Sequence, residues 1–269
     1  MIKSLVVALL FAFAVQGASI EPLAAQDRER GGNDRDLPER DEFRQTYELA
    51  PGAQVELSSL NCSINIENAP GNTAEVHIVR SARTREALEY GKIDVEQTPN
   101  SLIIRGQRDR DGDWRGRGRE VRQRVYLRIP RQVNLWAHGI NGSVTGGEID
   151  GTVRLNGING VVRIDQATGY VDISGINGRV MMNIASVDER GVRVTGVNGG
   201  VELRFSDDLN ADLEVSGCNG SVHADMPNVT VQGKIRRDNF RARIGEGGTP
   251  IVVNGVNGRV RLTRAGTAG

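Results

Sequence analysis

Gly139-Ile140-Asn141-Gly142 is the first of six copies of a Gly-x-Asn-Gly motif, and this motif decides the fold of the chain. The other copies are Gly157-Ile158-Asn159-Gly160, Gly175-Ile176-Asn177-Gly178, Gly196-Val197-Asn198-Gly199, Gly217-Cys218-Asn219-Gly220 and Gly255-Val256-Asn257-Gly258. Successive Asn residues are 18, 18, 21, 21 and 38 residues apart. A motif that recurs at a nearly fixed period indicates a repeat architecture.

Each motif lies between two segments in which apolar and polar residues alternate, such as residues 153–156 before the second copy and 161–164 after it. Alternation with a period of two indicates half-buried strands. The same frame identifies a degenerate seventh copy in residues 55–66, where Ser59 and Cys62 replace the glycines. The long last step leaves room for one more copy, and residues 229–233 match its first strand.

These periods predict an all-β chain that forms a parallel β-solenoid, in which each coil pairs with the next along the axis. An antiparallel meander is the alternative, because Asn-Gly is also the strongest two-residue hairpin signal. The solenoid is favoured because the residue inside each motif is always of aliphatic size, as a stacked internal column requires: Leu60, Ile140, Ile158, Ile176, Val197, Cys218 and Val256.

A second column supports the same register. The exposed position in the first strand of each copy reads Trp136, Arg154, Asp172, Arg193, Glu214 and Val252. If the copies stack in chain order, opposite charges lie side by side at a coil spacing of ~4.8 Å.

The Asn residues are interpreted as structural. Asn tolerates the left-handed backbone region that a sharp corner requires, and stacked amides can both donate and accept along the axis. We therefore expect an Asn ladder at a buried corner, formed by Asn61, Asn141, Asn159, Asn177, Asn198, Asn219 and Asn257.

The first 25 residues read as a cleaved signal peptide, with a Lys near the start, a short apolar run and small residues after it. Residues 26–42 are rich in charge and poor in aliphatic side chains, which predicts a disordered charged linker. The chain is expected to be extracytoplasmic: periplasmic, at the cell surface or secreted. Its formal net charge of zero gives no indication of a partner.

The Gly-Ile-Asn-Gly repeats resemble a family of bacterial putative adhesins built from β-strand repeats, related to an autotransporter adhesin head domain. The leader, the Pro51-Gly52 turn and the strand at residues 125–130 before the repeats match the same pattern. The resemblance implies a right-handed β-helix-like fold outside the cytoplasm, and the family offers no catalytic residues. The degenerate copy at Asn61 and the 38-residue gap depart from its pattern.

Residues 43–132 form an N-terminal strand segment, and residues 133–265 form the repeat solenoid. The strand-like runs of the first part predict either irregular early coils or a small capping sheet over the first coil. Residues 105–131 hold ten Arg against four acidic residues, with Trp114, Arg115, Arg117 and Arg119 at the centre. The favoured interpretation is a solvated hairpin tip. The functional alternative is a loop that binds a polyanion or envelope glycan, with nucleic acid less favoured.

The sequence contains no established catalytic motif, and no catalytic, cofactor or metal site is predicted. The five coil steps between Cys62 and Cys218 exclude a disulfide, so both thiols are expected to be free. The three His share no metal-ligand spacing, and His138 is assigned a polar turn role. The acidic residues that an enzyme on this scaffold would use are Asp150, Asp165, Asp172 and Asp188.

The sequence thus predicts an exported, non-catalytic β-solenoid that acts as a surface or periplasmic adhesion, binding or structural module. Its partner would be an envelope polysaccharide or another surface protein, and the mature chain has no membrane-spanning segment. A carbohydrate-active enzyme on a β-helix scaffold is the alternative. A third option is assembly through an open C-terminal coil at residues 260–262.

Overall fold

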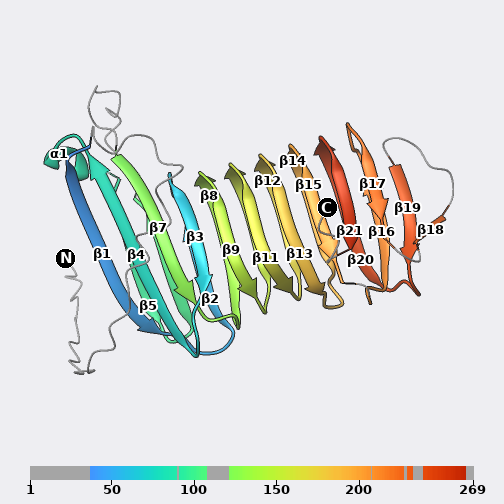
Figure 1. Ribbon diagram of the computed structural model, residues 1–269, viewed down its shortest axis with the longest axis horizontal. Coiled ribbons are helices and arrows are strands. Elements are labelled where there is room, and N and C mark those ends of the chain that lie inside the picture. Colours follow the sequence, from blue (N-terminus) through green and yellow to red (C-terminus); the bar gives the residue numbers. More distant parts are fainter. Residues whose placement is uncertain are drawn as a thin grey trace, which may run out of the picture. The chain divides into compact units, whose positions relative to one another are not determined.

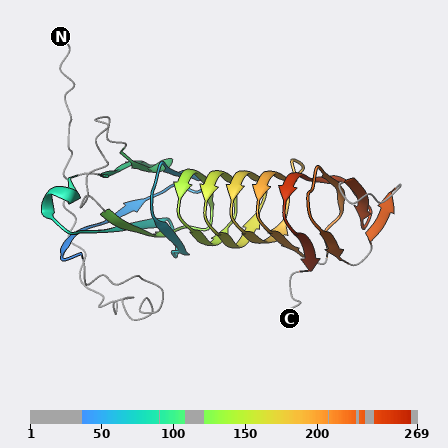
Figure 2. The same cartoon turned by 90° about the horizontal axis from the view of Figure 1, so that it is seen from above.

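Two β-sheets lie face to face, and the chain passes from one to the other at almost every corner (Figure 1, Figure 2). The computed structural model describes residues 37–89, 91–107, 121–206, 208–226, 229–232 and 239–264. These belong to the unit Asp36–Gly269. The predicted signal peptide lies outside the described residues.

Sheet A has ten strands. In spatial order they are β1 (Glu39–Glu48), β4 (Thr73–Ala82), β7 (Val121–Ile129), β3 (Ser63–Asn68), β9 (Val144–Ile149), β11 (Val162–Thr168), β13 (Val180–Ser186), β15 (Val201–Phe205), β21 (Val260–Arg264) and β17 (Val222–Asp225).

Sheet B has eleven strands. From the opposite end they are β18 (Val229–Gln232), β19 (Asn239–Ile244), β16 (Ala211–Ser216), β20 (Thr249–Asn257), β14 (Val192–Asn198), β12 (Val171–Asn177), β10 (Val153–Asn159), β8 (Val133–Asn141), β2 (Ala53–Ser58), β6 (Ser101–Gly106) and β5 (Ile93–Thr98). Among the described residues the one helix is the short α1 (Arg85–Leu88), which is capped by Thr84. None of the helices that the structure describes is long and apolar enough to cross a membrane.

The predicted parallel β-solenoid is confirmed. One coil consists of a strand of sheet B followed by a strand of sheet A, and coils pair in parallel through both sheets. Equivalent motif positions are in register, so Ile158 pairs with Ile140 and Ile176 with Val197. The antiparallel meander is excluded for the repeats because successive copies run in the same direction.

The order of the coils differs from the chain order expected at the sequence level. The last coil, β20–β21, lies between β14–β15 and β16–β17, and pairs with both. As a consequence Arg193 lies beside Val252 rather than Glu214, and the charge alternation stops there. Because β21 is inside sheet A, residues 260–262 are not an open edge, and assembly through them is ruled out.

At the N-terminal end the structure combines the two expected alternatives. The β6–β7 pair forms a further parallel coil outside β2–β3. Beyond it, β5 extends sheet B and β4 and β1 extend sheet A as antiparallel strands, which act as a cap. Strand β1 begins at Glu39, so residues 39–42 of the predicted linker are in a strand, and Asp41 pairs with Arg80.

The C-terminal end of sheet B is also antiparallel. Strand β19 runs against β16, and β18 runs against β19. The expectation that residues 229–233 start a missing coil is therefore wrong: residues 229–232 form an edge strand of the cap. These reversed strands change the direction of pairing at the end of the stack, so the next parallel coil cannot be added there.

The core fills the space between the two sheets and consists of aliphatic residues from alternate strand positions. It is continuous from Leu49 to Leu262 and crosses residue 132, where the sequence suggested a boundary between the strand segment and the solenoid. In most coils the inner positions are Val, Ile or Leu, which suit a narrow interior with parallel strands on both sides.

Candidate binding surface

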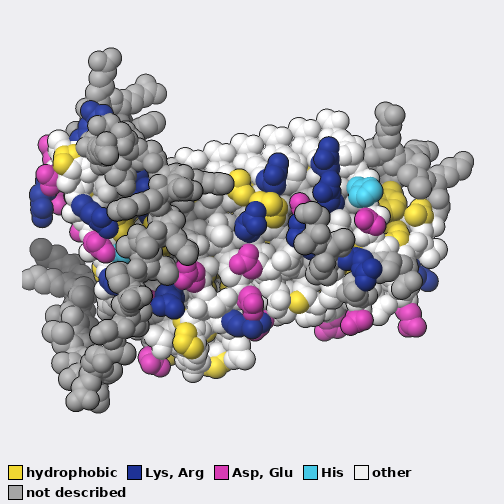
Figure 3. Space-filling view, viewed as in Figure 1, with side chains coloured by type: hydrophobic (Ala, Val, Ile, Leu, Met, Phe, Trp, Pro, Cys, Tyr) yellow, Lys and Arg dark blue, Asp and Glu magenta, His cyan; other side chains and the backbone are white. Residues whose placement is uncertain are grey.

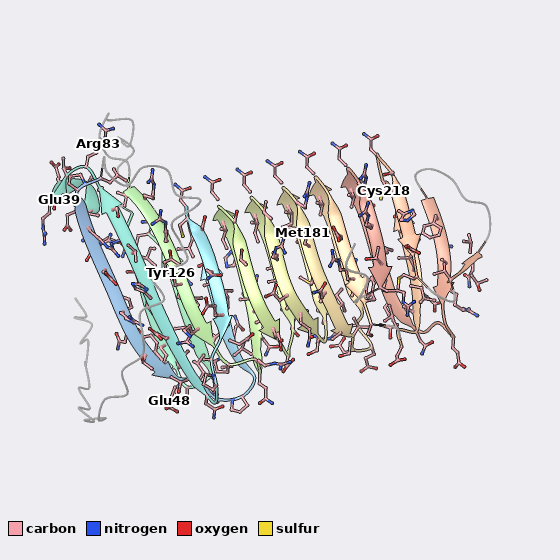
Figure 4. All side chains as sticks on the ribbon, viewed as in Figure 1. Glu39, Glu48, Arg83, Tyr126, Met181 and Cys218 are labelled. Atoms are coloured by element: carbon pink, nitrogen blue, oxygen red, sulfur yellow. The ribbon has the colours of Figure 1, made fainter. Side chains whose placement is uncertain are left out.

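The corner where sheet B passes to sheet A carries the Asn ladder. Each side-chain amide donates to the Oδ1 of its neighbour: Asn141 to Asn61 at 2.7 Å, Asn159 to Asn141 and Asn177 to Asn159 at 3.0 Å, Asn198 to Asn177 at 3.2 Å, Asn257 to Asn198 at 3.1 Å and Asn219 to Asn257 at 3.3 Å. All seven predicted residues therefore lie in one row, and Figure 4 shows side chains in a row along this edge.

The ladder is exposed, not buried as expected. The residue before each Asn, such as Ile158 or Ile176, points into the core, and the alternation of a strand turns the Asn outward. An amide has two N–H donors and an oxygen that can accept twice. One donor and one acceptor site of each inner Asn serve the ladder, which leaves the others available to solvent or a ligand.

The glycines, not the Asn residues, allow the corner to form. The first Gly of each motif has a φ near +60°, as at Gly175, whereas the only non-Gly residue with positive φ among the described residues is Ser59. The second Gly is required by close approach: a Cβ on Gly178 would lie 2.0 Å from the carbonyl oxygen of Gly160. The left-handed role assigned to Asn in the sequence analysis is therefore wrong.

The outer face of sheet B carries an exposed aromatic ring. Trp136 on β8 is 39% exposed, and its ring centroid lies 4.9 Å from that of His138 on the same strand. Glu56 on β2 and Arg154 on β10 are its register partners on the two neighbouring strands. Farther along the same row come Asp172 and Arg193. Trp136 thus stands in a line of charged side chains that can form hydrogen bonds.

A polar network holds the N-terminal side of this ring. The Oε1 of Glu56 lies 3.4 Å from the Nε2 of His138 and 3.6 Å from Nη2 of Arg105 on β6. Arg105 also donates to the Oγ of Ser58, which is buried. Because His138 is tied to Glu56, the orientation of its ring is restrained, and with it the ring of Trp136.

A second ring lies nearby. Tyr170 precedes β12, two coil steps or ~10 Å along the axis from Trp136. The guanidinium of Arg190 lies 4.9 Å from the centre of the Tyr170 ring and donates to Asp188 at 2.6 Å. This hydrogen bond holds the pKa of the Asp188 carboxyl below its usual range. Asp188 is therefore engaged in a local ion pair.

The polar row beside Trp136 and its neighbours is continuous. His138, Asn156, Ser174, Thr195, Asn254 and Ser216 share one register position on adjacent strands. Asn156 donates to Ser174 at 2.7 Å. Hence the outer face of sheet B, from β10 to β16, presents amide and hydroxyl groups at the coil spacing next to the row that contains Trp136.

The structure does not bring the four predicted carboxylates together. Asp172 is on the outer face of sheet B, Asp165 is on β11 of sheet A, and Asp188 is in the connection between β13 and β14. Asp150 pairs with Arg131, with 3.1 Å between its Oδ2 and the Nε of that arginine. No pair of these residues shares a position that could hold one substrate bond between two carboxyl groups.

Other predicted features have mixed outcomes. The loop residues Trp114, Arg115, Arg117 and Arg119 lie outside the described residues. Both cysteines are free and buried, which confirms the expected thiols. The described part of the chain contains no group of three His, Cys, Asp or Glu side chains able to hold a metal ion.

Sequence reasoning missed the network around Trp136. It placed Trp136 and His138 in the correct columns, but it did not bring Glu56 and Arg105 to them, because residues 62–132 separate the first copy from the second. The available signal was the register of the degenerate copy: once residues 55–58 are aligned with 135–138, Glu56 falls beside Trp136.

Comparisons with known proteins give structural neighbours only. No family model matches the chain, and no curated protein matches it. A solved structure described as a "putative cell adhesion protein" from Clostridium sporogenes aligns at 11% identity over 84% of this chain and 100% of that chain, with a TM-score of 0.49. A "putative adhesin" from Bacteroides fragilis aligns at 9% identity over 84% and 98%, with a TM-score of 0.32.

A third structure, a "putative adhesin" from Parabacteroides merdae, aligns at 8% identity over 83% of this chain and 96% of that chain, with a TM-score of 0.26. The chain is therefore similar, at low identity, to solved bacterial proteins described as adhesins.

Proposed function

We propose that this chain is a non-catalytic adhesion or binding module that holds an extended glycan along the outer face of sheet B. The main support for this proposal is Trp136, whose exposed ring lies on a flat sheet. The ring is restrained by His138 and has Glu56 and Arg154 as register partners. An aromatic face covers the apolar face of a sugar ring, while the neighbouring charged, amide and hydroxyl groups bind its hydroxyls.

The geometry of the face fits a linear polymer better than a small ligand. The side-chain rows run along the solenoid axis, and Trp136 and Tyr170 are separated by ~10 Å along that axis, on the scale of two linked sugar rings. A rigid set of rows loses little entropy when it binds an extended chain, which favours affinity. The dispersed carboxylates support a binding role over hydrolysis.

The test compares Trp136→Ala with Val161→Ala, a control that removes another exposed apolar side chain from a corner of the molecule. Both variants and the wild type are mixed with insoluble envelope polysaccharide and with purified peptidoglycan, and the bound fraction is measured after sedimentation. We expect only Trp136→Ala to lose binding, by about tenfold, since aromatic contacts contribute ~1 kcal/mol or more. Equal retention of all three proteins would refute the proposed face.

We also propose that the chain is exported and acts in the periplasm, at the cell surface or after secretion. The support is the sequence of its first 25 residues. Cell fractionation followed by mass spectrometry of the N-terminal peptide of the mature protein tests this. Recovery of an intact chain from the cytoplasm, with residue 1 or 2 at its N-terminus, would contradict export.

A further inference from the structure

Basic side chains lie along the outer face of sheet A, with acidic side chains among them (Figure 3). Trp136 is on the other sheet. The basic side chains include Arg163 on β11, Arg179 just before β13, Arg259 just before β21 and Arg261 on β21. Most other arginines of the described chain have a carboxylate partner; Arg204, for example, lies 2.8 Å from Glu202. Within the described residues no ion pair forms at Arg179 or Arg259.

Arg179, Gly200 and Arg259 occupy the same position on three successive coils. The residues that follow them, Val180, Val201 and Val260, are register partners. Arg179 and Arg259 are therefore separated by two coil steps, ~10 Å at the backbone, with only a glycine between them. The Gly200 position, called the notch here, lies between these two arginines.

The Arg179 side chain leans over this notch. A Cβ placed on Gly200 would lie 3.9 Å from Cγ and Nε of Arg179 and 3.8 Å from the carbonyl oxygen of Arg259. The cation of Arg179 is thus directed across Gly200 toward the coil that carries Arg259. Arg259 lies on the other side of the same glycine, and two like charges on neighbouring positions repel each other unless an anion lies between them.

The chemistry of the notch selects oxyanions. A guanidinium presents a planar fork of N–H donors that matches carboxylate, sulfate and phosphate groups. Arg261 is two residues beyond Arg259, so it points to the same face of β21 and extends the positive surface. Glu202, the acidic residue in the same row, is already held by Arg204. The notch therefore keeps a net positive charge.

We propose that Arg179 and Arg259 bind an anionic group of an acidic polysaccharide in the notch over Gly200, with Arg163 and Arg261 attracting further groups of the same polymer. This site is on a different sheet from the glycan face proposed above and does not depend on it. A glycan is favoured over a nucleic acid because no Phe, Tyr or Trp occupies an outer position on the described strands β9 to β17 of sheet A, so this face offers no such platform on which bases could stack.

The decisive variant is Gly200→Asp, with Gly200→Asn as its neutral control of nearly the same shape. Gly200 does not have a positive φ and the space above it permits a side chain, so both variants should fold. The Asp carboxylate should occupy the notch and pair with Arg179 and Arg259. We expect Gly200→Asp to weaken binding of polygalacturonate by about tenfold in 50 mM NaCl, and Gly200→Asn to weaken it much less.

A second pair of variants separates this site from general attraction by positive charge. Arg179→Ser/Arg259→Ser removes the two cations, and Arg83→Ser/Arg85→Ser removes two exposed arginines at α1, which belong to neither proposed site. Binding of polygalacturonate, dextran sulfate and neutral dextran is measured for both by isothermal titration calorimetry at several salt concentrations, and thermal melts check the fold. Only the first double variant should lose binding of the two acidic polymers, by about tenfold or more.

Four outcomes would overturn the proposal. These are unchanged binding by Gly200→Asp, an equal loss in both double variants, equal affinity for neutral dextran, or tighter binding of a single-stranded oligonucleotide than of polygalacturonate. Gly200→Asp should weaken polygalacturonate binding by the same factor in the wild type and in the Trp136→Ala background, because the two sites are on different sheets. Failure of the glycan face and failure of the arginine notch are therefore seen in different variants.

Discussion

The side-chain amide of Asn257 donates to Oδ1 of Asn198, 59 residues earlier in the chain, at 3.1 Å. Asn219 precedes Asn257 in sequence but lies on its far side and donates to it at 3.3 Å. The last coil of the chain therefore completes the stack from within. Strands β14 and β16, and likewise β15 and β17, are joined only through β20 and β21.

Removal of residues 249–269 should consequently disrupt the end of the solenoid. Strand β16 would retain only its antiparallel partner β19, and β17 would lose its only partner in the described structure. We expect the amides of residues 211–225 to exchange with solvent at least ~10-fold faster, measured by hydrogen-exchange mass spectrometry. A chain shortened by residues 265–269 alone is the control. Full protection after the long truncation would mean that β16 can stack directly on β14.

Ser59→Gly should stabilise the protein. Ser59 stands where the other copies have the first Gly of the motif, and its φ of 56° is strained for a residue with a Cβ. Relief of this strain should raise the free energy of unfolding by about 1 kcal/mol in urea denaturation. Ser63→Gly, in strand β3, should lower it, because Gly weakens a strand. A loss of stability in Ser59→Gly would show that the serine itself is required.

Gly178→Ala should be strongly destabilising. The added Cβ would lie 2.0 Å from the carbonyl oxygen of Gly160, a backbone atom that cannot move without displacing the neighbouring coil. We expect a loss of ~3 kcal/mol in the free energy of unfolding. Gly200→Ala serves as the control, since its nearest neighbours would be 3.8 Å away, and it should change stability by less than ~1 kcal/mol. Similar stabilities would contradict the close approach.

Asn177→Ala should cost more than Asn219→Ala. Asn177 donates to Asn159 and accepts from Asn198, whereas Asn219 makes one ladder bond, to Asn257. Because the ladder is exposed and water replaces lost partners, we expect ~1 kcal/mol for Asn177→Ala and about half as much for Asn219→Ala, by urea denaturation. An equal loss in the free energy of unfolding for the two variants would indicate that the hydrogen bonds of the ladder do not contribute to stability.

We expect the protein to become less stable at alkaline pH because both of its thiols are buried. Burial raises the pKa of the Cys62 thiol to about 12 and also raises that of Cys218. Above the ordinary thiol pKa of 9.0 the unfolded chain loses the Cys62 proton while the folded chain keeps it, so stability is full below pH ~9 and falls as the pH rises toward ~12. Cys62→Ala should remove this part of the pH dependence in urea denaturation between pH 8 and ~10.5.

Chemical labelling provides an independent check on the same groups. Native protein should react slowly with iodoacetamide at both cysteines, and rapid labelling should appear only in denaturant. Fast labelling of Cys62 in the native protein would contradict its burial.

Much of the structure of one coil could be predicted from the sequence. Apolar and polar residues alternate in its strands, and the Gly-x-Asn-Gly motif marks the corner between them. The internal column from Leu60 to Val256, the membership of the Asn ladder and the free thiols follow from aligning the copies. The exposure of the ladder was also implicit, since a residue next to an inward Ile must point outward. The error was to infer that the Asn residues lie at a buried corner because Asn tolerates an unusual backbone conformation.

The surface around Trp136 could not be read in the same way. Glu56 and Arg105 reach it through strands that are distant in sequence, and only the pairing of β2 with β8 and β6 shows it. The notch over Gly200 likewise depends on Arg259, which neighbours Gly200 only because the last coil is inserted.

The sequence by itself determined the shape of one coil, its inner and outer faces, and the hydrogen bonds between equivalent Asn residues. The tertiary structure alone decided the order of coils at both ends. The physical reason is that the copies carry nearly identical inner residues and edges, so any two can pair in register at similar energy. The order is selected by the antiparallel strands β1, β4 and β5 at one end and β18 and β19 at the other, which can pair only at an edge of the stack.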